Sequence, residues 1–238
     1  MTPIFTPFFG SPDAHEGAEG IWAWQSGPVD TGIVRLSPEE TARVEKLVDP
    51  EKRARLGDYL KVRKHLIAIL LGLPAEDVRL SHDLDGKPFL IDVPHVSTSF
   101  SDTQEWNALA LERSVPVGVD LEQVRDIGWD AMLPMISDAE EAALVRDAVE
   151  ASNDLSPFFR CWTAKEAVLK AAGTGMRGGA RRVLVPADLI YGRTSTAYSR
   201  KDDAVYSVDC AALDQVIIVR ARRTYPSSRI DTHIGPTS

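Results

Sequence analysis

Residues 156–175, SPFFRCWTAKEAVLKAAGTG, form the stretch around which the rest of the chain is organised. Ser156 offers a hydroxyl suited to an N-cap, and Pro157 would occupy the first helical position, where proline is tolerated. Gly173 closes the segment with the residue type that most readily takes the left-handed conformation beyond a helix end. The residues between make about four turns, so the sequence predicts a helix here.

One face of this predicted helix carries Trp162, Glu166 and Lys170 at spacings of four residues. Side chains at that spacing lie on the same side of an α-helix. A glutamate one turn before a lysine is also an ordinary surface ion pair, which stabilises a helix by about 0.2–0.5 kcal/mol. The helix alone therefore leaves a structural and a functional interpretation open.

A second stretch, VPVGVDLEQV at residues 115–124, alternates apolar residues with others and predicts a strand. Its second face carries Gly118, Asp120 and Glu122, so two carboxylates lie side by side with space beside them. Neighbouring carboxylates repel each other unless they are solvated or share a cation. An all-oxygen site of this kind suits Mg²⁺, and a half-solvated strand face is the alternative.

The two stretches together resemble the paired signature of 4′-phosphopantetheinyl transferases of the Sfp type. That family's pattern is roughly G-[IV]-D-[IL]-E followed by W-x-x-K-E-A-x-x-K-x-x-G-x-G, and GVDLE and WTAKEAVLKAAGTG fill every defining position. Upstream, PEKRAR, DGKPFL and VSTSFSD resemble the family's earlier motifs in the expected order. The resemblance spans residues 20–222 or so, nearly the whole chain.

The resemblance implies an α+β fold in which two similar α+β halves form an intramolecular pseudo-dimer, with the active site between them. The residues themselves show no internal repeat, but helices and antiparallel strands come in two runs that divide near 113–116. We therefore expect four parts: a loose N-terminal segment at 1–20, an N-terminal half at 21–114, a C-terminal half with the metal site at 115–223, and a tail at 224–238.

Two helices are predicted early in the N-terminal half. Ser37 followed by Pro38 and Glu40 is a capping-box start. A second helix should begin after Asp49, loosen near Gly57 and continue to about residue 71.

The resemblance also assigns chemistry to individual residues. It implies that Asp120, Glu122 and Glu166 hold Mg²⁺ against the pyrophosphate of coenzyme A. Glu166 would also be the base that takes the proton of the attacking serine, and Lys170 would offset negative charge on the transferred group. Lys165 lies about 100° around the helix from Glu166 and would reach a phosphate of the nucleotide from the flank.

Further upstream residues are expected to bind coenzyme A. Lys52 and Arg55 match basic positions that hold the 3′-phosphate end, although a lysine- and arginine-rich helix face is more simply a solvated surface. Lys87 precedes a proline, so it projects from extended backbone and suits a phosphate contact. Ser99 belongs to the serine-rich motif, where the family usually has Ser-His-Ser. Phe100 stands in place of that histidine and cannot donate its hydrogen bond.

Composition excludes several classes of protein. The 238 residues are 44% hydrophobic, enough for one large or two small domains, and the net charge of −8 argues against a nucleic-acid binder. The two cysteines give no disulfide or zinc pattern. The N-terminus does not look like a signal peptide, and LIAILLGL at 66–73 is too short to cross a membrane. We therefore expect a cytoplasmic protein, and the pseudo-dimer that the resemblance implies makes a monomer the expectation.

The implied activity is transfer of 4′-phosphopantetheine from coenzyme A to a serine of an acyl or peptidyl carrier protein, with release of adenosine 3′,5′-bisphosphate. The alternatives are a Mg²⁺-dependent phosphohydrolase and a coenzyme A- or carrier-binding module without turnover. Fatty acid, polyketide and nonribosomal peptide synthesis all use such carriers, and the residues favour none of the three. For carrier docking we expect Arg177, Arg181 and Arg182 to act with the apolar residues of 129–136, for which a place in the core is the alternative.

Overall fold

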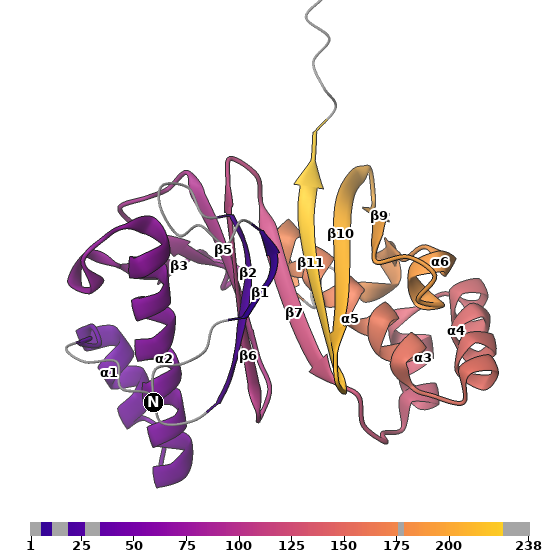
Figure 1. Cartoon of the computed structure of the whole chain (residues 1–238), viewed down its shortest axis with the longest axis horizontal. Helices are drawn as coiled ribbons and strands as arrows, with labels where there is room; N and C mark the ends of the chain where they lie inside the picture. The colour runs from indigo at the N-terminus through magenta and orange to yellow at the C-terminus, as the bar shows by residue number, and fades with distance from the viewer. Residues whose placement is uncertain (1–5, 11–18, 27–33, 176–178, 226–238) are drawn as a thin grey trace, which may run out of the picture.

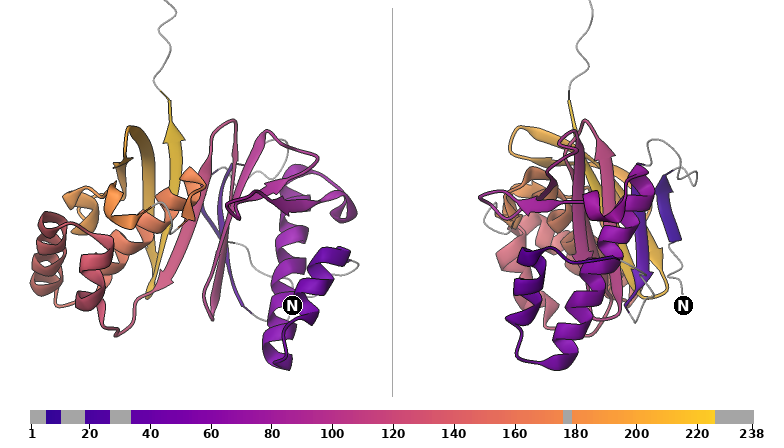
Figure 2. Two further views of the ribbon diagram at one scale, coloured as in Figure 1. Left: turned by 180° about the vertical axis from the view of Figure 1, so that it is seen from behind. Right: turned by 90° about the vertical axis from the view of Figure 1, so that its left-hand side faces the viewer.

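The structure is a computed structural model that describes residues 6–10, 19–26, 34–175 and 179–225. Two β-sheets pack face to face, and helices cover the outer side of each sheet (Figure 1). Figure 2 shows the same order of layers from behind, and its right-hand view shows the helices of the N-terminal half in front of their sheet. The predicted α+β architecture of two halves is confirmed.

The N-terminal half has a six-stranded antiparallel sheet with strand order β1-β2-β6-β5-β4-β3. Its strands are β1 (Thr6–Gly10), β2 (Gly20–Gln25), β3 (Leu80–His82), β4 (Pro88–Leu90), β5 (Val96–Asp102) and β6 (Trp106–Arg113). Its helices are α1 (Pro38–Glu45), α2 (Pro50–Leu71) and the short 3₁₀ helix η1 (Ala75–Asp77). Apolar side chains of α2 pack on this sheet and form its core.

The C-terminal half has a five-stranded antiparallel sheet with strand order β7-β11-β10-β9-β8. Its strands are β7 (Val117–Gln123), β8 (Val183–Leu184), β9 (Thr196–Lys201), β10 (Ala204–Leu213) and β11 (Val216–Thr224). Its helices are α3 (Trp129–Ile136), α4 (Ala139–Ser152), α5 (Ser156–Ala172), α6 (Ala187–Ile190) and the 3₁₀ helix η3 (Ala180–Arg182). The central helix α5 is buried along most of its length between the sheet and the other helices.

Several local expectations are corrected by the structure. Helix α5 begins at Ser156, so this serine is inside the helix and its hydroxyl donates to Asp154 at 2.6 Å instead of capping. Helix α2 runs unbroken through Gly57, because its apolar face packs on the sheet along the C-terminal turns. Residues 6–10 form an edge strand although 1–20 was expected to be loose, and 226–238 of the expected tail lie outside the described residues.

The two sheets meet in a third apolar core. It is made mostly of small and β-branched residues from β2, β6, β7 and β11, such as Ala108, Ala110 and Val119. A buried ion cluster completes the interface: Arg220 on β11 pairs with Glu112 on β6 at 2.9 Å and with a carboxylate of its own sheet. The halves therefore share one continuous interior.

The hydroxyls of β5 also join the sheets. Strand β7 is the edge of its sheet, so some of its N–H groups face away from β11. Ser97 and Ser99 accept hydrogen bonds from the N–H groups of Val117 and Val119, each at 3.0 Å. The alternating serines of β5 thus satisfy the free edge of β7.

Gly118 explains how α5 comes so close to β7. A Cβ atom on this glycine would lie 2.0 Å from the carbonyl oxygen of Ala167 and 2.4 Å from the nitrogen of Ala171. Only glycine therefore allows the helix backbone to rest on the strand. This contact carries the polar residues of β7 to the face of α5 that holds Glu166 and Lys170.

Among the described helices, none has the length and hydropathy needed to cross a membrane.

Candidate active site

Asp120 on β7 is at the centre of the site. The residue is 5% exposed, and its Oδ1 atom accepts hydrogen bonds from Ser101 at 2.8 Å and from Lys170 at 2.7 Å. Its Oδ2 atom is buried without a hydrogen-bond partner in the described part of the chain. Burial raises the pKa of Asp120, and Lys170 and Ser101 oppose that rise.

Glu166 projects from α5 toward the two carboxylates of β7. Burial raises the pKa of Glu166 to about 7, with a further contribution from the negative charge of Asp120, while Lys170 lowers it. Its Oε1 atom, like Asp120 Oδ2, is buried and has no partner among the described residues. Glu166 is therefore a carboxylate whose proton affinity suits proton transfer near neutral pH.

Glu122 is the third carboxylate and is held from two sides. Its Oε1 atom accepts from Trp162 Nε1 at 3.1 Å, and its Oε2 atom pairs with Arg125 at 3.0 Å. The indole of Trp162 thus orients a carboxylate of the site.

A cavity of about 550 Å³ opens beside these groups, and Asp120, Glu122, Arg125 and Lys170 are among the residues that line it. A second cavity of about 730 Å³ adjoins the first, since both are lined by the turn of residues 102–104. The first cavity has residues of both halves in its lining, and the second lies within the N-terminal half.

Whether this site could bind a metal ion depends on the side chains that would be its ligands. In the described ranges, no three acidic, histidine or cysteine side chains lie close enough to enclose an ion. Lys170 forms an ion pair with Asp120, and Arg125 forms one with Glu122. These two cations offset the negative charge of the carboxylates. Even so, Asp120 Oδ2 and Glu166 Oε1 are buried oxygens without partners, and the donor set of carboxylates is the one that Mg²⁺ prefers. These two oxygens suit such a cation, and the assignment of Asp120, Glu122 and Glu166 as its ligands stays a prediction.

The structure does not place Lys165 at the site. Lys165 is 0% exposed, and its ammonium pairs with Glu141 on α4 at 2.6 Å. It also donates to the carbonyl oxygens of Ala180, at 3.2 Å, and Val183. The turn of about 100° from Glu166 carries Lys165 into the packed side of α5, so its expected contact with the nucleotide is wrong.

Ser99 is likewise committed elsewhere. It is 3% exposed, and its hydroxyl accepts the hydrogen bond from Val119 that joins the sheets. Its expected role as a coenzyme A contact is therefore replaced by a structural one. Ser101, to which the sequence motifs gave no role, is the serine of this strand that reaches a carboxylate, Asp120. The period-2 spacing of Ser97, Ser99 and Ser101 is the signal that all three share one face.

The remaining predicted residues lie apart from the carboxylates. Lys52 and Arg55 are exposed on the first turns of α2 and line the 730 Å³ cavity. Lys87 follows the turn between β3 and β4 and donates to the carbonyl oxygen of Ala171 at 2.9 Å. Burial lowers the pKa of Lys87 to about 8. Lys87 thus connects the N-terminal sheet to the C-terminal end of α5.

The fold and the site together define a class of protein: two α+β halves with a cavity lined by carboxylates and a lysine where the halves meet. A family model described as the 4′-phosphopantetheinyl transferase superfamily matches residues 116–208.

Individual relatives extend the similarity. A 4′-phosphopantetheinyl transferase named gsp from Aneurinibacillus migulanus is 35% identical over 52% of this chain and 49% of its own length. The transferase ffp of Bacillus subtilis is 30% identical over 59% of this chain and 67% of its own. A rat L-aminoadipate-semialdehyde dehydrogenase-phosphopantetheinyl transferase is 26% identical over 66% of this chain and 57% of its own. The matched regions thus span about half to two thirds of these relatives. The chain belongs to the 4′-phosphopantetheinyl transferase superfamily.

Proposed function

We propose that the protein transfers the 4′-phosphopantetheine group of coenzyme A to a serine of an acyl or peptidyl carrier protein. Family membership and the relatives' names support the reaction class. The observation that carries the assignment is Glu166, whose buried Oε1 atom has no partner in the described part of the chain and whose pKa is raised to about 7 by burial and by the charge of Asp120, a residue that lines the first cavity. Such a group suits the removal of a proton from an alcohol.

The chemistry assigns a task to each side chain. The serine hydroxyl oxygen of the carrier bonds to the phosphorus that bears pantetheine, and that phosphorus loses its bond to the bridging oxygen of the nucleotide. The serine proton passes to Glu166, and adenosine 3′,5′-bisphosphate leaves with the bridging oxygen. Lys170, at 2.7 Å from Asp120 and half-buried, places a positive charge beside the group in transfer.

Three carboxylates would hold a magnesium ion at this site: Asp120, Glu122 and Glu166. When bound, the ion would neutralise charge on the pyrophosphate. Lys170 and Arg125, which balance two of these carboxylates in the structure, are free to turn toward phosphate oxygens when the carboxylates bind a cation. The two cations therefore favour donor and metal binding together.

Carrier docking is proposed at α3 and η3, which pack against each other. Met135 of α3 is 67% exposed, and Arg181 is exposed on η3. Arg182 pairs with Asp202 at 2.6 Å, and Arg177 lies outside the described residues. An apolar residue beside exposed positive charge suits an acidic carrier. Because both halves of the site come from one chain, we propose that the protein acts as a monomer.

The test incubates the protein with an apo carrier protein, Mg²⁺ and coenzyme A, and measures the intact mass of the carrier. A pantetheine adduct is expected, and it should be lost in Glu166→Gln but kept in Glu150→Gln, which neutralises an exposed glutamate at the end of α4. Cleavage of coenzyme A without an adduct would indicate a phosphohydrolase. Binding of coenzyme A without either product would indicate a module that lacks turnover.

A further inference from the structure

Ser101 differs from the other two serines of β5 in the group that it binds. Ser97, Ser99 and Ser101 share the face of the strand that meets β7. Ser97 and Ser99 accept hydrogen bonds from backbone N–H groups of β7, whereas the hydroxyl of Ser101 donates to the carboxylate of Asp120 at 2.8 Å. The first two bonds join the halves whatever side chains β7 carries. The bond of Ser101 depends on one side chain, and that side chain belongs to the candidate active site.

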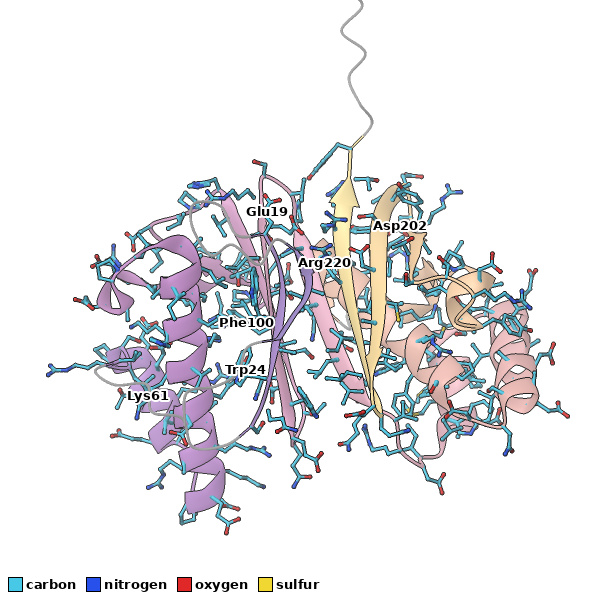
Figure 3. All side chains as sticks on the ribbon, in the orientation of Figure 1. Glu19, Trp24, Lys61, Phe100, Asp202 and Arg220 are labelled. Atoms are coloured by element: carbon cyan, nitrogen blue, oxygen red, sulfur yellow. The ribbon has the colours of Figure 1, made fainter. Side chains whose placement is uncertain are left out.

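Strand β5 also contacts the cation that is paired with Asp120. Lys170 donates to Asp120 Oδ1 at 2.7 Å and to the carbonyl oxygen of Phe100 at 3.2 Å. The side chain of Phe100 points the other way, toward α2 (Figure 3). All four residues, Phe100 and Ser101 of β5 with Asp120 and Lys170, line the 550 Å³ cavity. Two charged groups of the C-terminal half are thus held by neighbouring residues of the N-terminal half.

These contacts occupy one oxygen of Asp120 and leave the other free. Oδ1 accepts both hydrogen bonds, and Oδ2 is buried with no partner among the described residues. Lys170 is a point charge on a flexible stem, so it balances the charge of Asp120 without fixing the plane of the carboxylate. The hydroxyl of Ser101 is attached directly to the Cβ of a strand residue that is 8% exposed, so its oxygen has little freedom. The bond from Ser101 therefore determines where Oδ2 points.

We infer that Ser101 is a positioning residue, which orients the carboxylate of Asp120 so that Oδ2 stays free for a divalent cation. Loss of a hydrogen-bond partner of a metal-binding side chain typically lowers metal affinity or activity 10- to 100-fold. The inference rests on the proposed function, from which it takes Asp120 as a ligand of the magnesium ion. It adds a task for the N-terminal half, whose strand β5 holds a cation ligand of the C-terminal half in place.

The test measures binding without turnover. Titration calorimetry of coenzyme A, with no carrier present, is repeated at a series of Mg²⁺ concentrations. Wild type should bind coenzyme A more tightly as Mg²⁺ rises, and in Ser101→Ala the midpoint of this effect should move to about 10- to 100-fold higher Mg²⁺. Without Mg²⁺ the two proteins should bind coenzyme A equally, because Ser101 acts through Asp120.

Ser97→Ala is the matched control. It removes a hydroxyl from the same face of the same strand, but the partner of that hydroxyl is a backbone N–H group, so the Mg²⁺ midpoint should stay that of wild type. Ser101→Thr keeps the hydroxyl and should restore most of the Mg²⁺ affinity. Should Ser101→Ala fail to fold, Ser101→Cys replaces the hydroxyl by a weak donor of similar size, and its midpoint should rise several-fold.

Each other outcome overturns the inference or separates it from the proposed function. Coenzyme A binding by wild type that does not respond to Mg²⁺ would overturn the inference. A midpoint in Ser101→Ala or Ser101→Cys equal to that of wild type, or a loss in Ser101→Thr as large as in Ser101→Ala, would do the same while carrier modification by wild type upheld the proposed function. If the carrier receives no pantetheine although the Mg²⁺ midpoint depends on Ser101, the proposed function falls and the inference stands.

Discussion

Replacing Gly118 by alanine should separate the two elements that build the active site. The added Cβ would lie 2.0 Å from one backbone atom of α5 and 2.4 Å from another, so no side-chain rotation relieves the clash. To restore an ordinary contact of 3.4 Å, α5 must move away from β7 by roughly 1.4 Å, and overpacking of this kind costs about 1–3 kcal/mol of stability. The same movement carries Glu166 and Lys170 away from Asp120. A misplacement of about 1 Å can lower turnover on the order of 100-fold.

Two measurements separate these effects. Urea unfolding should show a lower midpoint for Gly118→Ala, and carrier modification by the folded variant at saturating coenzyme A should be about 100-fold slower. Gly128→Ala is the matched control, because a Cβ there meets no atom within 4 Å and its φ of −70° suits alanine. A variant with wild-type stability and turnover would refute the close contact between α5 and β7.

Three further predictions concern residues whose roles were assigned from the sequence. Lys165→Met should leave Glu141 buried without its ion-pair partner and destabilise the fold by about 3–5 kcal/mol. The KM for coenzyme A of the folded fraction should stay unchanged. A raised KM at full stability would instead show that Lys165 contacts the nucleotide. Lys87 should titrate near pH 8 in NMR spectra of the isotopically labelled amine. Coenzyme A should raise that pKa, because a nearby phosphate favours the ammonium form. An unchanged pKa on binding would show that Lys87 does not contact a phosphate. Charge reversal by Arg181→Glu and Arg182→Glu should raise the KM for the carrier alone, more so at low salt, and equal effects on both substrates would place these arginines at the nucleotide.

The sequence predicted much of the chemistry because the motifs are local. The spacing of Glu166 and Lys170 is a property of any α-helix, and the alternation that puts Asp120 and Glu122 on one face is a property of any strand. The resemblance to a known family then implied that the two faces meet. The structure adds the reason, since the missing side chain of Gly118 allows the helix to rest on the strand.

What the sequence could not predict depends on which face of an element is buried. Helical spacing places Lys165 at an angle from Glu166, but only the packing of α4 shows that this direction leads into the core. Likewise, alternation in β5 separates Ser99 from Phe100 without showing which of them faces the other half. The stacking of Arg63 on Phe100 joins residues 37 positions apart on different elements, and no local pattern in the sequence reports such a contact.

The hydroxyl bonds between β5 and β7 limit how the two halves can move. The hydroxyl of Ser97 bonds to the N–H group of Val117, and the hydroxyl of Ser99 bonds to that of Val119. The bonded residues are therefore two positions apart on each strand. A shift of one residue along the strands would break both hydrogen bonds, and a shift of two would also take Ser101 away from Asp120. Sliding of one half along the other therefore costs these contacts, whereas a rotation about the line where the strands meet can keep them. Widening of the cavities for a large donor and a protein acceptor should therefore occur as a hinge opening, with the register of the halves unchanged.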